Sequence, residues 1–246
     1  MRAEEARRAR RRSLLLQGGL VAVVLLVVVG VTAAVLSQRQ DDTTASSGSS
    51  SSSSGSSGSS STPAGFTSDG VVSVGSDQAP VTLTLVEDFA CPACRAFEAA
   101  NASLFKSYAS GDEVRLDYRP IAFLDRVSTD GYSSRALNAA ACVVDADQAD
   151  WPAMHEALYA SQPAEGGPGL SEDELVSLAV GAGADEQDVR SCIADDTFGS
   201  WVESTTGSVT SQSWFTGTPT VLVDGTPIDD VSAAGIQQAV EDARGE

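Results

Sequence analysis

The chain has 246 residues, with 15 lysines and arginines against 34 aspartates and glutamates, and its formal net charge is −19. This length suits one large domain or two small ones. The whole acidic excess follows residue 40, where there are 32 acidic residues and 8 basic ones. A domain so acidic repels nucleic-acid phosphates and anionic lipids, which excludes nucleic-acid binding. Because His155 is the single histidine, a histidine-based metal site is not expected either.

A long apolar run near the N-terminus predicts a membrane anchor. Residues 14–36 carry no charge and are mainly Leu and Val, and as a helix they would span the roughly 30 Å hydrocarbon core of a bilayer. Arginines dominate residues 7–12, so the positive-inside rule places the basic tail of residues 1–13 in the cytoplasm and the rest outside. A cleaved signal peptide is the alternative, although its apolar core is normally about 7–15 residues long. With either an anchor or a cleaved signal peptide, the folded domain lies outside the cytoplasm.

The next segment predicts a flexible linker. Every residue from 46 to 61 is Ser or Gly, so this stretch has no side chains that could form a core. We assign residues 37–65 to the linker and residues 66–246 to the folded domain. We therefore expect a single-pass protein of the cell membrane whose domain is extracytoplasmic.

The folded part reads as an α/β sheet domain. Apolar β-branched runs indicate strands, and capped segments with one apolar side indicate helices. A helix between the second and third strands is a crossover, which favours parallel pairing of those strands. A helical insertion of about residues 121–200 splits the domain. In chain order we expect strands at 71–74, 81–86 and 114–118, with a helix at 92–108 between the last two; helices at 133–144 and 151–161; helices beginning at Ser171 and Asp185; a helix at 197–211; a hairpin at 220–228; and a closing helix at 232–244.

Some details of these elements are specific. Ser171 and Glu174 have the spacing of a capping box. Asp224-Gly225 suits the type I′ turn of a hairpin. The helix at 92–108 is expected to bury one apolar face, made of Ala93, Phe97, Ala100 and Leu104.

The strongest chemical signal is Cys91-Pro92-Ala93-Cys94, which follows a predicted strand and opens a predicted helix. Unpaired backbone N–H groups and the positive end of the helix dipole meet a residue at this position. Both stabilise a thiolate, and a cysteine in such a motif has a lowered pKa. The two sulfurs are close enough for a disulfide. We therefore expect a redox-active pair, with Cys91 as the exposed attacking sulfur and Cys94 as the sheltered resolving sulfur.

Other interpretations of the cysteines remain open from the residues alone. A zinc site would need a second closely spaced pair, but Cys142 and Cys192 lie 50 residues apart, so we expect no metal. An inert disulfide within the motif is the other alternative. In an oxidising compartment, the remaining Cys142 and Cys192 predict a structural bridge in the insertion. Alternatively, Cys142 and Cys192 form a second redox-active pair that passes electrons to or from the first.

Two separated motifs resemble those of a known family. They are Glu87-Asp88-Phe89-Ala90-Cys91-Pro92-Ala93-Cys94 and the later Gly217-Thr218-Pro219-Thr220. In these two motifs the chain resembles the DsbA-like branch of the thioredoxin superfamily, especially its exported, membrane-anchored bacterial members. The resemblance covers about residues 68–246 and implies a thioredoxin-like fold with a helical insertion. It also implies thiol–disulfide exchange, in which Pro219 is the cis-proline facing the active-site disulfide. By the same resemblance, the Thr218 backbone pairs with an incoming substrate strand.

The chain departs from the pattern of this family near the motif. Many relatives carry a buried acid six residues before the first cysteine, where it serves proton transfer of the second thiol, and this chain has Leu85 there. Glu87 lies on the same strand face by the two-residue period and is the candidate substitute. A solvated acid at the strand end is the alternative. The Pro-Ala dipeptide contains no histidine, and we expect His155 to be packed or exposed rather than catalytic.

These features predict an exported, membrane-tethered thiol:disulfide oxidoreductase, most simply an oxidase that forms disulfides in secreted proteins. We expect no cofactor, a monomer, and substrates that are reduced or unfolded exported proteins. The resemblance implies a quinone-linked membrane partner that re-oxidises the enzyme. The alternatives are a non-catalytic binding module or chaperone with this fold and, within the enzyme class, a reductase or an isomerase. An apolar docking groove has four candidate rim residues, each of which is more often part of a core: Phe89, Phe123, Trp214 and Phe215.

Overall fold

The computed structural model describes residues 61–245. The predicted basic tail at 1–13, the predicted anchor at 14–36 and most of the predicted linker lie outside the described residues. Within the described part, no helix is both long and apolar enough to cross a bilayer. The tethering of the domain therefore stays a prediction from the sequence.

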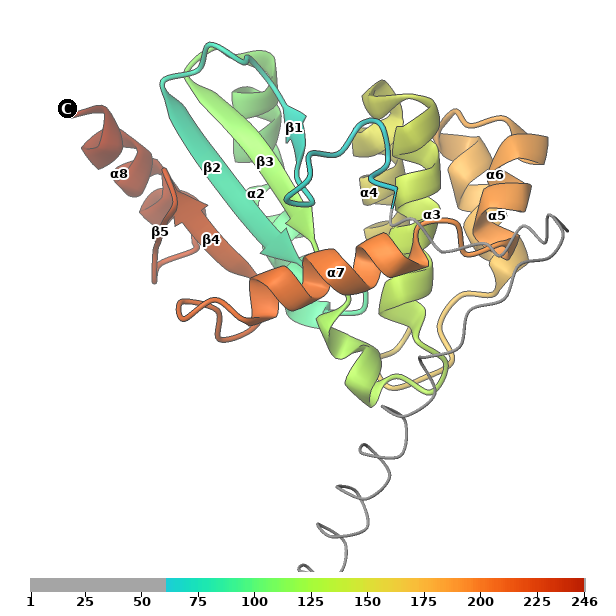
Figure 1. Cartoon of the computed structure of the whole chain (residues 1–246). Coiled ribbons are helices and arrows are strands. Elements are labelled where there is room, and N and C mark those ends of the chain that lie inside the picture. Colours follow the sequence, from blue (N-terminus) through green and yellow to red (C-terminus); the bar gives the residue numbers. More distant parts are fainter. Residues whose placement is uncertain (1–60, 246) are drawn as a thin grey trace, which may run out of the picture. The chain divides into compact units, whose positions relative to one another are not determined.

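A five-stranded sheet with the order β1-β3-β2-β4-β5 forms the centre of the domain (Figure 1). β2 (Val81–Glu87) pairs in parallel with β3 (Val114–Pro120) and antiparallel with β4 (Thr220–Val223). β1 (Val72–Val74) and β5 (Thr226–Pro227) are the antiparallel edge strands. The parallel pairing of β2 and β3 confirms the prediction from the crossover helix.

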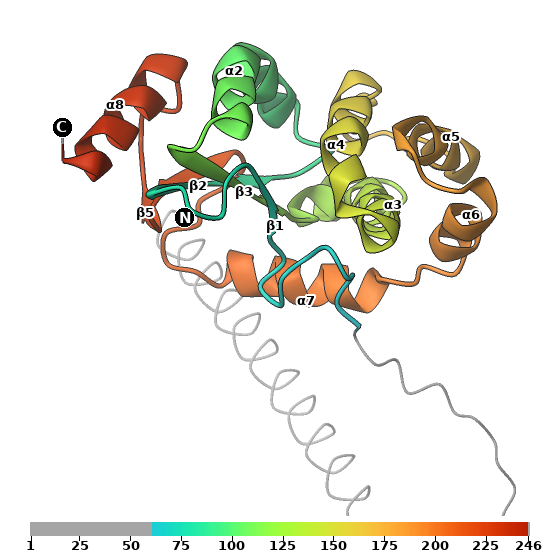
Figure 2. The same cartoon turned by 90° about the horizontal axis from the view of Figure 1, so that it is seen from above.

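Helices cover both faces of this sheet. α2 (Pro92–Ser110) and α8 (Ala233–Arg244) lie on one face, and α7 (Gly199–Thr210) lies on the other (Figure 2). The predicted closing helix is confirmed, with Ile236 and Val240 buried. A helix–sheet–helix sandwich of this kind buries the central strand from both sides.

The predicted helical insertion is confirmed between β3 and α7. It contains four α-helices and lies beside the end of the sheet (Figure 1). The capping box predicted at Ser171 and Glu174 is present, and Asp185 caps the next helix by accepting hydrogen bonds from two backbone N–H groups. Its helices are α3 (Tyr132–Ala146), α4 (Trp151–Ala160), α5 (Glu172–Ala182) and α6 (Glu186–Ala194), with short 3-10 turns at Phe123–Val127 and Gln148–Asp150.

The sequence of β2 explains its central position. Val81, Leu83 and Leu85 are at most 1% exposed and join the main core. Val86 is also fully buried but belongs to a second, smaller cluster with Ile121, Val209 and Leu222. The end of β2 is therefore held by apolar contacts on both faces, which positions the residues that follow it.

The buried face of α2 differs from the prediction. Phe97 is buried as expected, but Ala93 and Ala100 are exposed and Leu104 is only half-buried. Small alanines mark a helix face weakly, so the contacts at the start of the helix decide its rotation. The face that packs inward consists of Cys94, Phe97, Asn101 and Phe105.

The folded domain begins a few residues before the predicted boundary at 66. Pro63 is buried, and the backbone N–H of Ala64 donates a hydrogen bond to Asp145 on α3, with a distance of 2.7 Å. Gly65 packs so tightly that a Cβ atom there would lie 2.4 Å from the Val144 side chain. The last residues assigned to the linker thus pack against the insertion.

Candidate active site

Cys91 occupies the N-cap of α2. Its sulfur accepts a hydrogen bond from the backbone N–H of Cys94, with a distance of 3.4 Å. Pro92 follows in the first turn, where its missing N–H costs nothing. The strand β2, the short turn and the helix thus place Cys91 at the helix N-terminus, as the motif predicted. Both cysteines of the motif are free thiols in this structure.

Hydrogen bonding makes Cys91 acidic. The Cys94 thiol, as a donor to the Cys91 sulfur, is the largest cause that lowers the pKa of Cys91, to about 6. Desolvation opposes this effect, while a hydrogen bond from the Thr218 side chain and those from the backbone N–H groups of Cys94 and Ala93 lower the pKa of Cys91 further. Cys91 is therefore largely a thiolate at neutral pH, which is the nucleophilic form of cysteine.

Cys94 is the opposite case. Its side chain is fully buried, whereas 6% of the Cys91 residue surface is exposed. Desolvation is the main cause that raises the pKa of Cys94 far above that of a free thiol, and negative charge on Glu87 or Cys91 raises it further. Cys91 is thus nearly buried rather than exposed as predicted. The structure contains one acidic thiol with a small exposed area and one fully sheltered thiol that keeps its proton.

The second sequence motif lies against the first. The Thr218–Pro219 peptide bond is cis, and the Cys91 sulfur lies 3.4 Å from the carbonyl oxygen of Thr218, to which it donates when it is protonated. Thr220 closes this loop because its hydroxyl donates to the Gly217 carbonyl, with a distance of 2.6 Å. The structure thus brings together Cys91, Thr218 and Pro219, which are far apart in the sequence.

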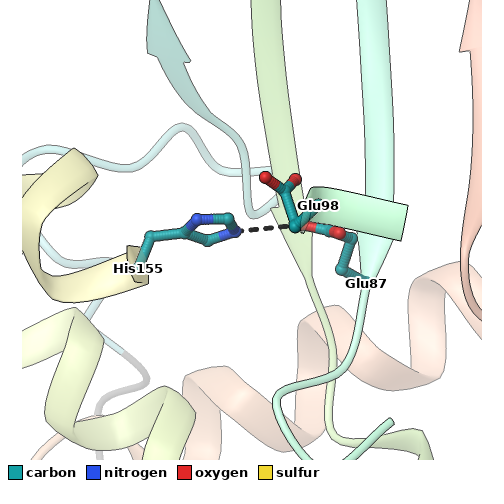
Figure 3. A group of neighbouring side chains, drawn as sticks. All are labelled: Glu87, Glu98 and His155. Atoms are coloured by element: carbon teal, nitrogen blue, oxygen red, sulfur yellow. Dashed lines mark hydrogen bonds and ion pairs between the residues drawn. The ribbon is translucent and has the colours of Figure 1, made fainter. Parts of the chain in front are cut away.

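Glu87 is buried beneath the motif rather than solvated at the end of its strand. Only 3% of its surface is exposed, and its Oε2 lies 3.0 Å from Nε2 of His155 on α4. Glu98 on α2 completes a cluster whose ligand-type atoms all lie within 4.8 Å of one another (Figure 3). The interpretation of Glu87 as a solvated acid was wrong, and His155 is packed against a candidate proton-transfer residue.

Burial decides the charge of this cluster. Desolvation raises the pKa of Glu87 and that of Glu98 to about 8 in each case. It lowers the pKa of His155. At neutral pH the cluster therefore consists of largely protonated carboxyls beside a neutral imidazole. The sequence signal for Glu98 was its position four residues after Cys94 on one helix, which places the two on the same side.

Asp88 is a further buried residue that the sequence analysis did not single out. Its carboxylate accepts hydrogen bonds from the Ala90 N–H, the Leu124 N–H and the Ser133 hydroxyl, at 2.8, 2.8 and 2.7 Å. Gln162 donates to the carbonyls of Phe89 and Cys91 at 2.9 Å. Asp88 and Gln162 therefore connect the loop before the motif to the helical insertion.

The four aromatic candidates for a docking groove separate in the structure. Phe89 is 1% exposed and packs among Trp151, His155 and Tyr159, so of its two interpretations, core or groove rim, the structure supports the core. The other three, Phe123, Trp214 and Phe215, are half-buried and pack against the smaller cluster. The rings of Phe123 and Phe215 are in contact, with a centroid distance of 5.1 Å.

Cys142 and Cys192 form a disulfide in the insertion. It connects α3 to α6, with a sulfur–sulfur distance of 2.00 Å. Cys142 is buried and Cys192 is half-buried. The bridge thus connects two helices of the insertion covalently.

The fold and the paired thiols define the class of thiol–disulfide oxidoreductases. The chain belongs to the thioredoxin family, because the family model described as Thioredoxin matches residues 67–242. Among solved structures, the reduced form of DsbA from Mycobacterium tuberculosis is 30% identical and superposes with a TM-score of 0.62. That match covers 72% of this chain and 93% of the other. These relatives support a thiol–disulfide oxidoreductase activity of the DsbA-like kind.

Two further comparisons, one of structure and one of sequence, extend the similarity. BdbD from Bacillus subtilis has a TM-score of 0.64 at 22% identity, with 74% of this chain and 96% of the other covered. The serine/threonine-protein kinase PknE of Mycobacterium tuberculosis is 34% identical over 131 residues. That alignment covers 51% of this chain and 23% of the kinase, so the chain spans less than a quarter of this curated relative.

Proposed function

We propose that the chain is an extracytoplasmic, membrane-tethered oxidase that introduces disulfides into exported proteins. The observation that carries the proposal is the Cys91 thiol, which is acidic, caps a helix and lies 3.4 Å from the Thr218 carbonyl. The thiolate of an acidic thiol is a good leaving group, so Cys91 leaves the mixed disulfide readily, which makes the enzyme an efficient disulfide donor. The apolar run of residues 14–36 supports the tether.

The reaction uses the two thiols in sequence. A substrate thiolate attacks Cys91 of the oxidised enzyme, the Cys91–Cys94 bond breaks, and Cys94 leaves as a thiolate that takes up a proton. A second substrate thiolate then attacks the substrate sulfur of the mixed disulfide. A substrate disulfide forms, Cys91 leaves as a thiolate, and the enzyme has gained two electrons. A quinone-linked membrane protein, as the resemblance implies, is the proposed re-oxidant.

The other site residues have supporting roles in this proposal. The Thr218 backbone and Pro219 face Cys91 and bind the substrate strand beside the sulfur that is attacked. Glu87 exchanges the proton with Cys94, because both are buried together and the charge of Glu87 acts on the Cys94 thiol. The bridge between Cys142 and Cys192 is structural.

Oxidative refolding tests this function. The oxidised full-length protein is mixed with reduced, unfolded ribonuclease A, and the return of ribonuclease activity is followed without another oxidant. We expect stoichiometric recovery that is abolished in Cys91→Ser and retained when Cys142 and Cys192 are both replaced by Ala. Binding of the unfolded substrate without oxidation would instead favour the chaperone alternative.

A further inference from the structure

We infer that Glu98 and His155 form a proton path between Glu87 and a solvent pocket on the side of the domain where α2 meets α4. The inference rests on the proposed function, because it extends the proposed exchange between Glu87 and Cys94. It assigns roles to two residues that act through Glu87 and do not touch the reacting sulfurs.

Turnover requires such a path. Cys94 gains a proton when the active-site disulfide opens and loses it when the disulfide forms again. Its side chain is fully buried, and Glu87 is 3% exposed, so neither meets bulk water directly. One buried acid could store a proton but could not pass it on without a neighbour that reaches solvent.

The cluster provides two neighbours of this kind. His155 Nε2 lies 3.0 Å from Glu87 Oε2, and the two carboxyl groups are close enough to share a hydrogen bond when one is protonated. Glu87 Oε1 and Glu98 Oε1 are both buried, and neither atom has a hydrogen-bond partner among the described residues. A proton held between the carboxyls supplies the donor that the buried oxygens lack.

The pocket begins where the cluster ends. A cavity of about 700 Å³ is lined by Glu98 and His155, while Glu87 does not reach it. Its ionisable lining is mixed, and comprises Arg95, Glu98 and Lys106 from α2, Tyr118 from β3, and His155, Glu156 and Tyr159 from α4. Glu98 and His155 are thus the groups that contact both the buried acid and the space open to water.

The electrostatic surroundings suit proton exchange. Burial raises the pKa of Glu87 and of Glu98 to about 8, close to neutral pH, where an acid can both take and release protons. Charge on Glu98 and Glu156 raises the pKa of His155 against the stronger effect of burial. Burial also raises the pKa of Tyr118 and Tyr159, so these two stay neutral. The carboxyls and the imidazole are therefore the groups in the cluster that change protonation.

The same three donors could also hold a divalent cation, since two carboxylates and an imidazole suit zinc. A bound cation would occupy the oxygens that a proton needs. The two possibilities differ in one respect that can be measured: a proton path works in metal-free protein. The experiment below is therefore carried out in the presence of a chelator.

The test measures the pH dependence of the step in which Cys94 takes part. The mixed disulfide is formed by rapid mixing of reduced protein with a small disulfide, which releases one small thiol, and its resolution by Cys94, which releases the second, is followed between pH 5.5 and 9 in EDTA. Glu98→Gln is expected to slow this step by about tenfold or more and to alter its pH profile. Glu156→Gln is the matched control, because it changes the charge of the same pocket and leaves the three cluster residues intact.

Two further readouts separate a proton path from a structural role. In Glu98→Ala, formate or acetate in the buffer should restore the rate in proportion to its concentration, because the cavity admits small acids. Alkylation of Cys91 should keep its wild-type pH profile in every variant. A His155→Gln variant that fails to fold leaves the Glu98 variants and the buffer rescue as the decisive data.

The outcomes distinguish this inference from the proposed function. Loss of oxidation in Cys91→Ser together with a wild-type profile in Glu98→Gln would overturn the proton path and leave the oxidase intact. A rate in EDTA that collapses and returns with added Zn²⁺ would also overturn it, in favour of a metal site. If the wild-type protein did not oxidise substrate at all, the proposed function would fail first.

Discussion

The sulfur of Cys91 lies 3.4 Å from the carbonyl oxygen of Thr218, although 127 residues separate the two in the chain. β2 and β4 create this proximity, because they are antiparallel neighbours, so the end of β2, which precedes Cys91, lies beside the start of β4, which follows Thr218. The loop with Thr218 and Pro219 therefore faces the only motif cysteine that has an exposed surface. A substrate strand bound to this loop would present its own cysteine to Cys91.

The first prediction concerns the order of the two thiols. Iodoacetamide should modify Cys91 before Cys94 in the reduced protein, and the rate should rise with a midpoint near pH 6, because hydrogen bonding lowers the pKa of Cys91 to about 6. Mass spectrometry of the labelled peptides over a pH series measures both. Cys94→Ala should accumulate mixed disulfides through Cys91. Faster labelling of Cys94 would reverse the assignment.

The second prediction concerns the bridge in the insertion. Replacing both Cys142 and Cys192 by Ala should lower the free energy of unfolding, with an upper value of about 4 kcal/mol from the chain-entropy model, since 50 residues separate them. The oxidase activity per folded molecule should change little. Urea unfolding and refolding assays test the two parts separately. An inactive variant with a normal fold and normal Cys91 reactivity would show that the bridge relays electrons.

The third prediction concerns the buried acid and pH. The unfolded chain releases the Glu87 proton near pH 4.5, but burial raises the pKa of Glu87 in the folded state to about 8. The unfolded state therefore binds fewer protons between these values, so the free energy of unfolding falls as the pH rises toward 8. Glu87→Gln should reduce this fall by up to about 1 kcal/mol per pH unit.

Urea unfolding of the oxidised protein between pH 7 and pH 9 provides the measurement. In the oxidised form Cys91 and Cys94 do not titrate, and His155 is neutral in this range because burial lowers its pKa. Glu98 contributes in the same direction as Glu87, so a reduced slope is expected rather than a flat one. Parallel curves for the wild type and Glu87→Gln would contradict the assignment.

The fourth prediction concerns the connection between the active-site loop and the insertion. Asp88→Ala should destabilise the domain by about 2–4 kcal/mol, because two buried donors and one part-buried donor lose their acceptor. Hydrogen exchange of the Ala90 and Leu124 amides should become faster in the variant. Asp125→Ala is a useful comparison, because Asp125 accepts a hydrogen bond from the backbone N–H of Ser134 in the insertion, whereas the Ala90 amide donates to Asp88. Equal effects of the two substitutions on Ala90 exchange would contradict a specific role of Asp88.

Several parts of this structure follow from local sequence, and others depend on distant contacts. Three features each follow from a few neighbouring residues. They are the capping box at Ser171, the left-handed backbone of Asp224 and Gly225, and the alternation of buried and half-buried side chains along β2. The rotation of α2 was predicted wrongly because alanines at 93 and 100 suit either an exposed or a buried position. The local sequence predicts structure where a residue type strongly prefers one conformation or one degree of burial, and it fails where the residue type has no such preference.

The buried cluster shows the same limit at the functional site. The Cys91–Cys94 motif and the Thr218–Pro219 loop were visible as sequence motifs, whereas Glu87 and His155 are separated by 68 residues and meet only because α4 packs beside the end of β2. The single histidine carried no motif of its own. Its position could be inferred only after the insertion was placed against the sheet.

The reduction potential of the Cys91–Cys94 couple tests the central proposal, that this enzyme is an oxidase, most directly. Stabilisation of the Cys91 thiolate favours the reduced dithiol over the disulfide, which makes the couple more oxidising. Equilibration with glutathione buffers should yield a value clearly above the roughly −270 mV of thioredoxin and below the roughly −120 mV of DsbA. A value at or below about −270 mV would contradict the oxidase and identify the protein as a reductase.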